Sequence, residues 1–295
     1  MSEQMQPLRG AGGQGVAETG PLVRLYFAPS RMLWRIGPAW AVVAGAVAAG
    51  APLGNAASLL RLATAVILAD LVWGILRRII PDSPGAGGTA TLQAPSLPYG
   101  RSGAPLAQVM QTVASGQHAS TAPWLGWLGG LALTVVLSLL LGAPALLISA
   151  AAVGLIFLTR ALFQRDSCPS FCLAFLDVGL PWALGAVLVW PDVAGEALLW
   201  FSQVGMLAAA FTLLQWGLYR ARFSAGRRLV ALYFGQVTLL VALVLLRQPW
   251  AVAVAALLLA PPTWWLARRG EAEVALARAL PWWWASMLAV AAIVR

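Results

Sequence analysis

The sequence predicts an all-α fold, a polytopic membrane helical bundle with about nine transmembrane helices, and two observations lead to this prediction. Of the 295 residues, 60% are apolar and only 10% are charged, whereas about a quarter of the residues in a soluble domain are charged. All nineteen basic residues are arginines, and they fall in clusters between long uncharged stretches. Such an alternation is typical of a chain that crosses a bilayer repeatedly.

The expected helices are the apolar stretches of about 20 residues, the length that crosses about 30 Å of hydrocarbon. The uncharged stretch of residues 124–159 is divided in two, because a single helix would run about 54 Å and Gly142-Ala143-Pro144 favours a turn at its middle. The nine expected helices are Gly37–Gly54, Ala56–Leu76, Trp124–Leu141, Ala143–Thr159, Phe171–Trp190, Ala197–Tyr219, Leu229–Leu246, Pro249–Leu266 and Ala279–Val294.

The arginines also predict the orientation of the chain. Sixteen of the nineteen lie before the first expected helix or after the second, fourth, sixth and eighth, and the opposite flanks hold only Arg61, Arg247 and Arg295. Because basic residues collect on cytoplasmic flanks, we expect a multi-pass protein of the bacterial cytoplasmic (inner) membrane, with the N-terminus inside and the C-terminus outside. Residues 1–33 would form a polar cytoplasmic tail, residues 34–295 a single transmembrane domain, and residues 81–123 within it a long cytoplasmic loop.

The formal net charge of +9 bears on the partners. In a soluble chain such a charge would suggest nucleic acid. Here we expect membrane lipids with anionic head groups as partners, and no nucleic acid. Many of the fifteen tryptophans, including the run Trp282-Trp283-Trp284, lie near expected helix ends, where indole rings settle in the head-group zone. Trp73 lies inside the second expected helix instead and could line a cavity.

Two acidic residues lie within expected helices, Asp70 and Asp177, both in the cytoplasmic half. Ionisable residues inside a membrane are costly, which makes them candidates for function. The structural alternative is that each carboxylate pairs with an arginine at a helix end, such as Arg77 or Arg160. Both interpretations stay open for Asp70, and for Asp177 we favour the ion pair.

Common catalytic motifs are missing from the sequence. His118 is the only histidine, and a phosphate-binding loop would need a lysine, which the chain lacks. The only two cysteines, Cys168 and Cys172, have no histidine or acidic cluster near them in the sequence. We therefore expect them to be packing residues rather than metal ligands.

Both the layout and three local stretches of sequence carry a family resemblance. The layout consists of nine helices, with basic cytoplasmic loops after the second and the sixth. The local stretches are Ala69-Asp70-Leu71-Val72-Trp73, Arg165-Asp166-Ser167-Cys168-Pro169, and Ala225-Gly226-Arg227-Arg228-Leu229 followed by Tyr233-Phe234-Gly235. In these features the chain resembles the UbiA superfamily of intramembrane prenyltransferases.

This resemblance implies two acidic motifs that hold Mg²⁺, which in turn grips the diphosphate of an isoprenyl donor. In the first motif this chain keeps only Asp70, the one candidate catalytic residue, and has Ala69, Trp73 and Arg77 at the other positions. The acid positions of the second motif fall at Gln215, Leu218 and Arg222. The expected substrate- or lipid-binding residues are Asp70, Trp73, Arg77, Asp177, Gln215, Tyr219 and Arg222.

The leading functional hypothesis is therefore a divergent or non-catalytic UbiA-like protein, which binds an isoprenoid, a quinone or a similar lipid in a cytoplasm-facing cavity. Arginine side chains could grip a phosphate directly. The first alternative is an active prenyltransferase with an atypical site, in which Asp70 and either Asp166 or Asp177 bind Mg²⁺; only this alternative needs a cofactor. The other alternative is a small-solute transporter or a subunit of a membrane protein complex.

Overall fold

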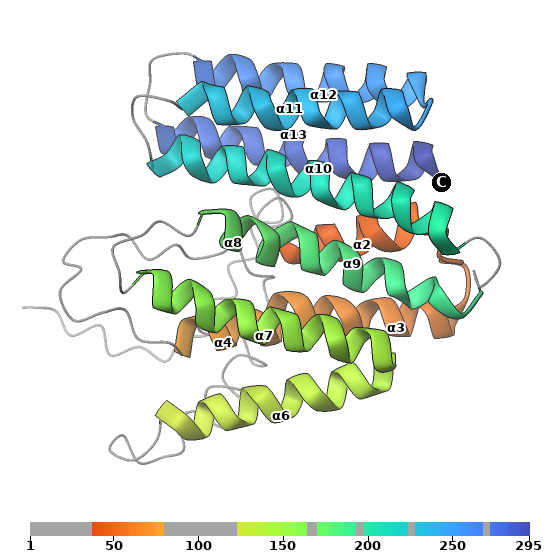
Figure 1. The fold of residues 1–295 in the computed structure, drawn as a ribbon, viewed down its shortest axis with the longest axis vertical. Coiled ribbons are helices and arrows are strands. Elements are labelled where there is room, and N and C mark those ends of the chain that lie inside the picture. Colours follow the sequence, from red (N-terminus) through yellow and green to blue (C-terminus); the bar gives the residue numbers. More distant parts are fainter. Residues whose placement is uncertain (1–36, 80–122, 164–169, 193–196, 224–227, 268–271) are drawn as a thin grey trace, which may run out of the picture.

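The computed structural model describes residues 37–79, 123–163, 170–192, 197–223, 228–267 and 272–295, and within these ranges all regular structure is helical (Figure 1). This confirms the predicted all-α class for the described residues. The expected tail, residues 81–122 of the expected loop, Asp166 and Cys168 lie outside the described residues, and the last residue of that loop, Pro123, begins a helix.

The helices follow the expected division of the chain closely. The first helix is α2 (Pro38–Ala48), and the second is a continuous run of α3 (Ala56–Val66), the π-helical η2 (Ile67–Val72) and α4 (Trp73–Ile79). Then come α6 (Pro123–Leu141), α7 (Ala143–Phe163), and a run of α8 (Ser170–Ala174), the π-helical η4 (Phe175–Gly179), α9 (Leu180–Ala186) and the 3₁₀-helical η5 (Val187–Asp192). The last four are α10 (Ala197–Phe223), α11 (Arg228–Leu245), α12 (Pro249–Ala267) and α13 (Ala272–Val294).

The first helix is shorter than predicted, because α2 ends at Ala48 rather than at Gly54. Gly50 has a φ of +82°, a conformation that glycine adopts readily, and it turns the chain before Pro52. The side chain of Asn55 then accepts a hydrogen bond from the backbone N–H of Ala57 at 3.0 Å and caps α3.

Tight turns join the helices at one end of the bundle, on the right in Figure 1. Gly142, with a φ of +108°, separates α6 from α7, which confirms the predicted hairpin, and Arg247, with a φ of +55°, lies between α11 and α12. The C-terminus lies at this same end. The opposite end holds the end of α4 with Arg77, the end of α10 with Arg220 and the start of α11. The arginine-rich helix ends therefore share one end of the bundle, called here the arginine end.

Two helix crossings are formed by contact between backbones. A Cβ atom added to Gly45 of α2 would lie 2.1 Å from the carbonyl oxygen of Trp182, and one added to Gly185 of α9 would lie 1.9 Å from the carbonyl oxygen of Val42. The crossing of α10 and α11 is similar, because a Cβ at Gly217 would lie 2.6 Å from the carbonyl oxygen of Ala231. Small residues at such crossings are typical of packed membrane helices.

The helix surfaces show an inverted polarity. Large apolar side chains are strongly exposed on several helices, among them Leu60, Leu140, Leu147, Leu257 and Trp250. The interior is mostly apolar as well, and ten polar side chains of the described residues are buried within it, among them Ser138, Ser149, Thr212, Gln215, Asp70 and Asp177.

By length and composition alone, one helical run among the described residues, Ser170–Val189, could cross a membrane, and the apolar portions of six others span only 10–17 residues. The number of membrane crossings therefore stays a prediction.

Candidate functional site

Both predicted intramembrane acids lie in π-helical turns. Asp70 lies in η2 and Asp177 in η4, and they are 3% and 4% exposed. A π-helical turn is a short local widening of an α-helix that is often found at functional sites. For η4 the sequence does carry a signal, because Pro181 lacks the N–H that would bond to the carbonyl of Asp177 four residues earlier. The sequence around Asp70 contains no such proline.

Asp177 connects three helices that are far apart in the sequence. Its Oδ1 accepts a hydrogen bond and a salt bridge from Nη1 of Arg77 at the end of α4. Its Oδ2 accepts a hydrogen bond from the hydroxyl of Tyr219 in the last turns of α10. The Arg77 and Asp177 side chains are only 15% and 5% exposed. The ion pair that we favoured for Asp177 is therefore present, and the role of Tyr219 as its second partner is one that the sequence did not suggest.

This arrangement affects the charges at the arginine end. A buried carboxylate without a partner is strongly unfavourable, and removing one member of a buried pair typically costs about 3–5 kcal/mol. Arg77 and Asp177 neutralise each other, and Tyr219 donates to the oxygen that Arg77 leaves free. The contact between α4, η4 and α10 thus depends on three polar side chains.

Several buried polar groups near this contact have no hydrogen-bond partner among the described residues. They are Nε and Nη2 of Arg77, Nε1 of Trp73 and Oε1 of Gln215. Trp73 precedes Arg77 by one helical turn, and Gln215 precedes Tyr219 by one turn, so each pair shares a helix face. Buried polar groups are nearly always hydrogen-bonded in folded proteins. The polar contact therefore holds donors and an acceptor that no described residue pairs.

Asp70 is placed close to this contact along its helix. Trp73 and Arg77 are one turn apart in α4 and share a helix face, and Asp70 lies three residues before Trp73 in the π-helical turn η2. Arg222 lies in the last turn of α10, and its side chain is outside the described part of the structure, as is that of Arg160. The structure thus joins three of the seven expected binding residues directly: Arg77, Asp177 and Tyr219.

The described residues do not fit the Mg²⁺ site that the family resemblance implies. A hard divalent cation needs several free oxygen ligands. Both carboxylate oxygens of Asp177 already have donors, and one of these donors is the cationic Arg77. No three acidic, histidine or cysteine residues come together within the described ranges.

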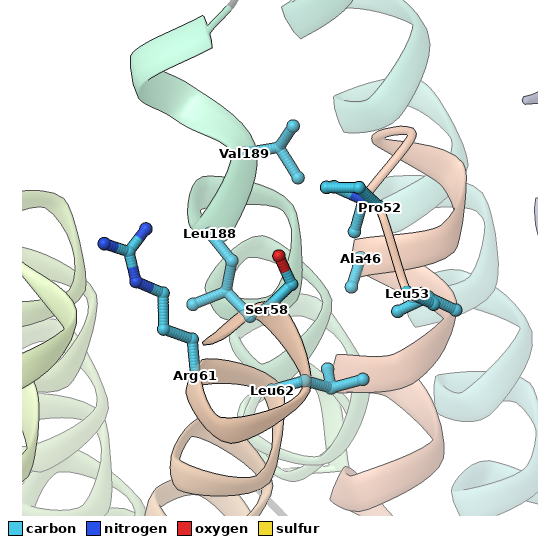
Figure 2. A pocket seen from close by; sticks show the side chains of 9 residues that line it. Ala46, Pro52, Leu53, Ser58, Arg61, Leu62, Leu188 and Val189 are labelled. Carbon is cyan, nitrogen blue, oxygen red and sulfur yellow. The ribbon is translucent and has the colours of Figure 1, made fainter. Parts of the chain in front are cut away.

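Elsewhere among the described residues lie two hollows that no predicted site residue lines. The first, of about 20 Å³, lies at the end opposite the arginine end, and Figure 2 shows Arg61 at its edge with Ser58 and Leu188 toward its middle. This volume is about that of one water molecule. The second is a groove of about 370 Å³ between α11 and α12.

One prediction about tryptophans is wrong. Trp283 and Trp284 are each 2% exposed and lie in the core, whereas the sequence placed them at a helix end. The reason is that α13 begins at Ala272, seven residues earlier than predicted, so the run lies well inside the helix. Trp250 and Trp264, at 77% and 60% exposure, lie on the surface. Trp73 is fully buried, and Cys172 is a half-buried free thiol.

Comparisons of the chain with protein-family models, with curated proteins and with solved structures found no match. Membership of the UbiA superfamily therefore remains a prediction from the layout and the local motifs.

Proposed function

We propose that the chain is a multi-pass protein of the bacterial inner membrane, of UbiA-like layout, that binds an isoprenoid, a quinone or a similar polar-headed lipid at its arginine end without metal-dependent prenyl transfer. The observation that carries this proposal is the set of buried, unpartnered hydrogen-bonding groups on Arg77, Trp73 and Gln215 beside the Arg77–Asp177–Tyr219 contact.

The membrane location is supported by the inverted polarity of the helices. Exposed side chains such as Leu140 and Leu147, at 70% and 73% exposure, would be unfavourable in water. In a bilayer they face lipid, and the buried serines, threonines and aspartates avoid it. The arginine end would face the cytoplasm, where basic residues collect and anionic lipids are found.

The ligand chemistry follows from the free groups. Arg77 has used only Nη1, and its remaining N–H donors, together with the indole N–H of Trp73, suit an oxygen acceptor. Phosphate oxygens and quinone carbonyls are both acceptors of this kind. A prenyl tail would lie against the apolar helices, so that a prenyl lipid satisfies both the polar groups and the apolar surface.

A binding experiment tests the proposal. The protein in lipid nanodiscs would be titrated with geranylgeranyl phosphate and, separately, with a short-tailed ubiquinone. We expect Trp73→Phe to weaken binding of the preferred ligand about threefold to tenfold, the effect of one hydrogen bond. The matched control is Trp250→Phe, at the other end of the bundle, which should leave the affinity unchanged. Equal affinities for both variants and the parent protein would refute the proposed site.

The catalytic and topological parts have their own tests. Mg²⁺-dependent release of diphosphate from a prenyl diphosphate, abolished by Asp70→Asn, would show an active prenyltransferase and overturn the non-catalytic part.

Alkaline phosphatase fused after Arg295 should be active, and green fluorescent protein at the same position should not fluoresce. The reverse result would overturn the proposed orientation.

A further inference from the structure

The groove between α11 and α12 is a second feature with ligand-binding chemistry. The two helices lie side by side in Figure 1, far from α4 and η4. The groove has a volume of about 370 Å³, and its lining includes Tyr233, Gln236 and Leu240 of α11 and Ala260, Thr263 and Trp264 of α12. Most of the lining is apolar, and its hydroxyl and amide groups belong to Tyr233, Gln236 and Thr263.

A chain of hydrogen bonds fixes the orientation of the Gln236 amide. The Thr263 hydroxyl donates to the carbonyl oxygen of Leu259 at 2.6 Å, so Oγ1 is left to accept. Nε2 of Gln236 donates to this oxygen. Gln236 must therefore turn its N–H group toward Thr263. Its Oε1 and its second N–H have no partner among the described residues and remain for a group in the groove.

Two adjacent prolines interrupt the backbone hydrogen bonding of α12 beside the groove. Pro261 and Pro262 lie inside α12, and neither has the N–H that would bond to the carbonyl four residues earlier. The carbonyls of Leu257 and Leu258 thus lack their helical donors. Neither residue lines the groove, whose α12 side is formed by Ala256, Leu259, Ala260, Thr263 and Trp264.

We propose that this groove binds one lipid alcohol, a molecule with a long apolar chain and a single hydroxyl group, whose hydroxyl donates to Oε1 of Gln236. The volume falls in the range of small-molecule sites, about 300–1,000 Å³. A hydroxyl can also accept a hydrogen bond from the second N–H of Gln236, so that one hydroxyl pairs with both free groups of the amide. The proposal concerns a different site from the lipid-binding site at Arg77, and it rests only on the membrane location.

A second protein helix fits the groove less well. The lining on α11 runs from Tyr233 to Leu240, about 10 Å along the axis, which is about the width of a single helix. A helix laid along α11 and α12 would also contact the exposed Val244 and Ala253, beyond the hollow. It would leave the hollow unfilled unless it supplied a large side chain at this one level. The lining carries no charged residue, so an anionic head group finds no cationic partner there.

Photolabelling tests the proposal. The protein in nanodiscs of phosphatidylcholine and phosphatidylglycerol would be irradiated with palmityl alcohol that carries a diazirine on its chain. We expect labelled peptides from α11 and α12, with labelling that unlabelled palmityl alcohol reduces. Palmityl methyl ether, which has the same chain but no O–H donor, should compete about threefold to tenfold less well. Gln236→Leu should remove this difference between the two competitors.

Matched variants separate the groove from ordinary contact with lipid. Ala260→Trp fills the groove and should abolish the competed labelling, whereas Ala253→Trp, also exposed on α12, should preserve it. Equal competition by the alcohol and the ether would overturn the proposal, and so would labelling that survives Ala260→Trp. A dimer that Gln236→Leu dissociates would also overturn it, because a second copy would then occupy the groove. Labelling of other helices that the unlabelled alcohol does not reduce would show that the protein lies in the bilayer, independently of the groove.

Discussion

The glycine crossings and the polar contact at the arginine end hold helices together in opposite ways. Where α2 crosses α9, backbones touch at Gly45 and Gly185, and no space is left for even one methyl group. Where α4, η4 and α10 meet, long polar side chains of Arg77, Asp177 and Tyr219 span the gap. The backbone contact fixes the distance between the helices and leaves one buried donor beside it unpaired, the indole N–H of Trp182, whereas the polar contact leaves several hydrogen-bonding groups unpaired.

This difference indicates where function can reside in a bundle of apolar helices. The glycine crossings set the geometry, because what meets there is backbone against backbone. At the polar contact, the N–H groups of Arg77 and Trp73 still need acceptors. If the bundle lies in a membrane, as we propose, an outside ligand could supply these acceptors.

Breaking a glycine crossing should have the largest effect. In Gly185→Ala the new Cβ would meet the carbonyl oxygen of Val42, a backbone atom that can move only with α2. We expect a loss above about 4 kcal/mol, the range that marks severe disruption, measured by reversible unfolding in mixed detergent micelles. Gly154→Ala is the matched control, since no atom lies within 4 Å of its new Cβ. It should stabilise the protein by about 1 kcal/mol or less.

Breaking the ion pair should come next. Arg77→Met leaves the buried carboxylate of Asp177 without its cation, and we expect a loss of about 3–5 kcal/mol in the same unfolding assay. The charge itself can be tested with the double variant Arg77→Met with Asp177→Leu. Replacing both partners by apolar groups should recover most of that loss. If the double variant were as unstable as the single one, the shapes of the two side chains and not their charges would hold the contact.

The sequence predicts the two kinds of contact unequally. Apolar runs and arginine clusters determine the helices and their ends well, because each depends on neighbours within one helix. Asp177 and Arg77 were also candidates for pairing, since an acid inside a bundle needs a cation. Tyr219 was expected only as a binding residue, because its phenol meets Asp177 only after three helices have packed. The partners of Gly45 and Gly185 depend in the same way on the full fold, and a glycine in a helix does not reveal which backbone it faces.

Removing one hydrogen bond from the polar contact should have a smaller effect. Tyr219→Phe keeps the ring and deletes the hydroxyl that donates to Asp177. A hydrogen bond to a charged group typically contributes about 1.5–3 kcal/mol, and we expect a loss of stability in that range. Tyr233→Phe, whose ring is exposed on α11, is the control and should change stability little. A result for Tyr219→Phe that matched its control would mean that the salt bridge alone holds the contact.

The smallest effect is expected where a hydrogen bond joins two helices without any charge. Oγ of Ser138 in α6 and Oγ of Ser149 in α7 lie 2.7 Å apart, and both side chains are buried. Ser138 donates its one proton to the carbonyl oxygen of Thr134, so Ser149 is the donor between the two helices. Neutral hydrogen bonds between membrane helices average about 0.6 kcal/mol, so Ser149→Ala should destabilise the protein by about that amount. Thr238→Val, which removes a hydroxyl bonded only within its own helix, is the control. If Ser149→Ala were as damaging as Tyr219→Phe, charge would not be what distinguishes the arginine end from the rest of the bundle.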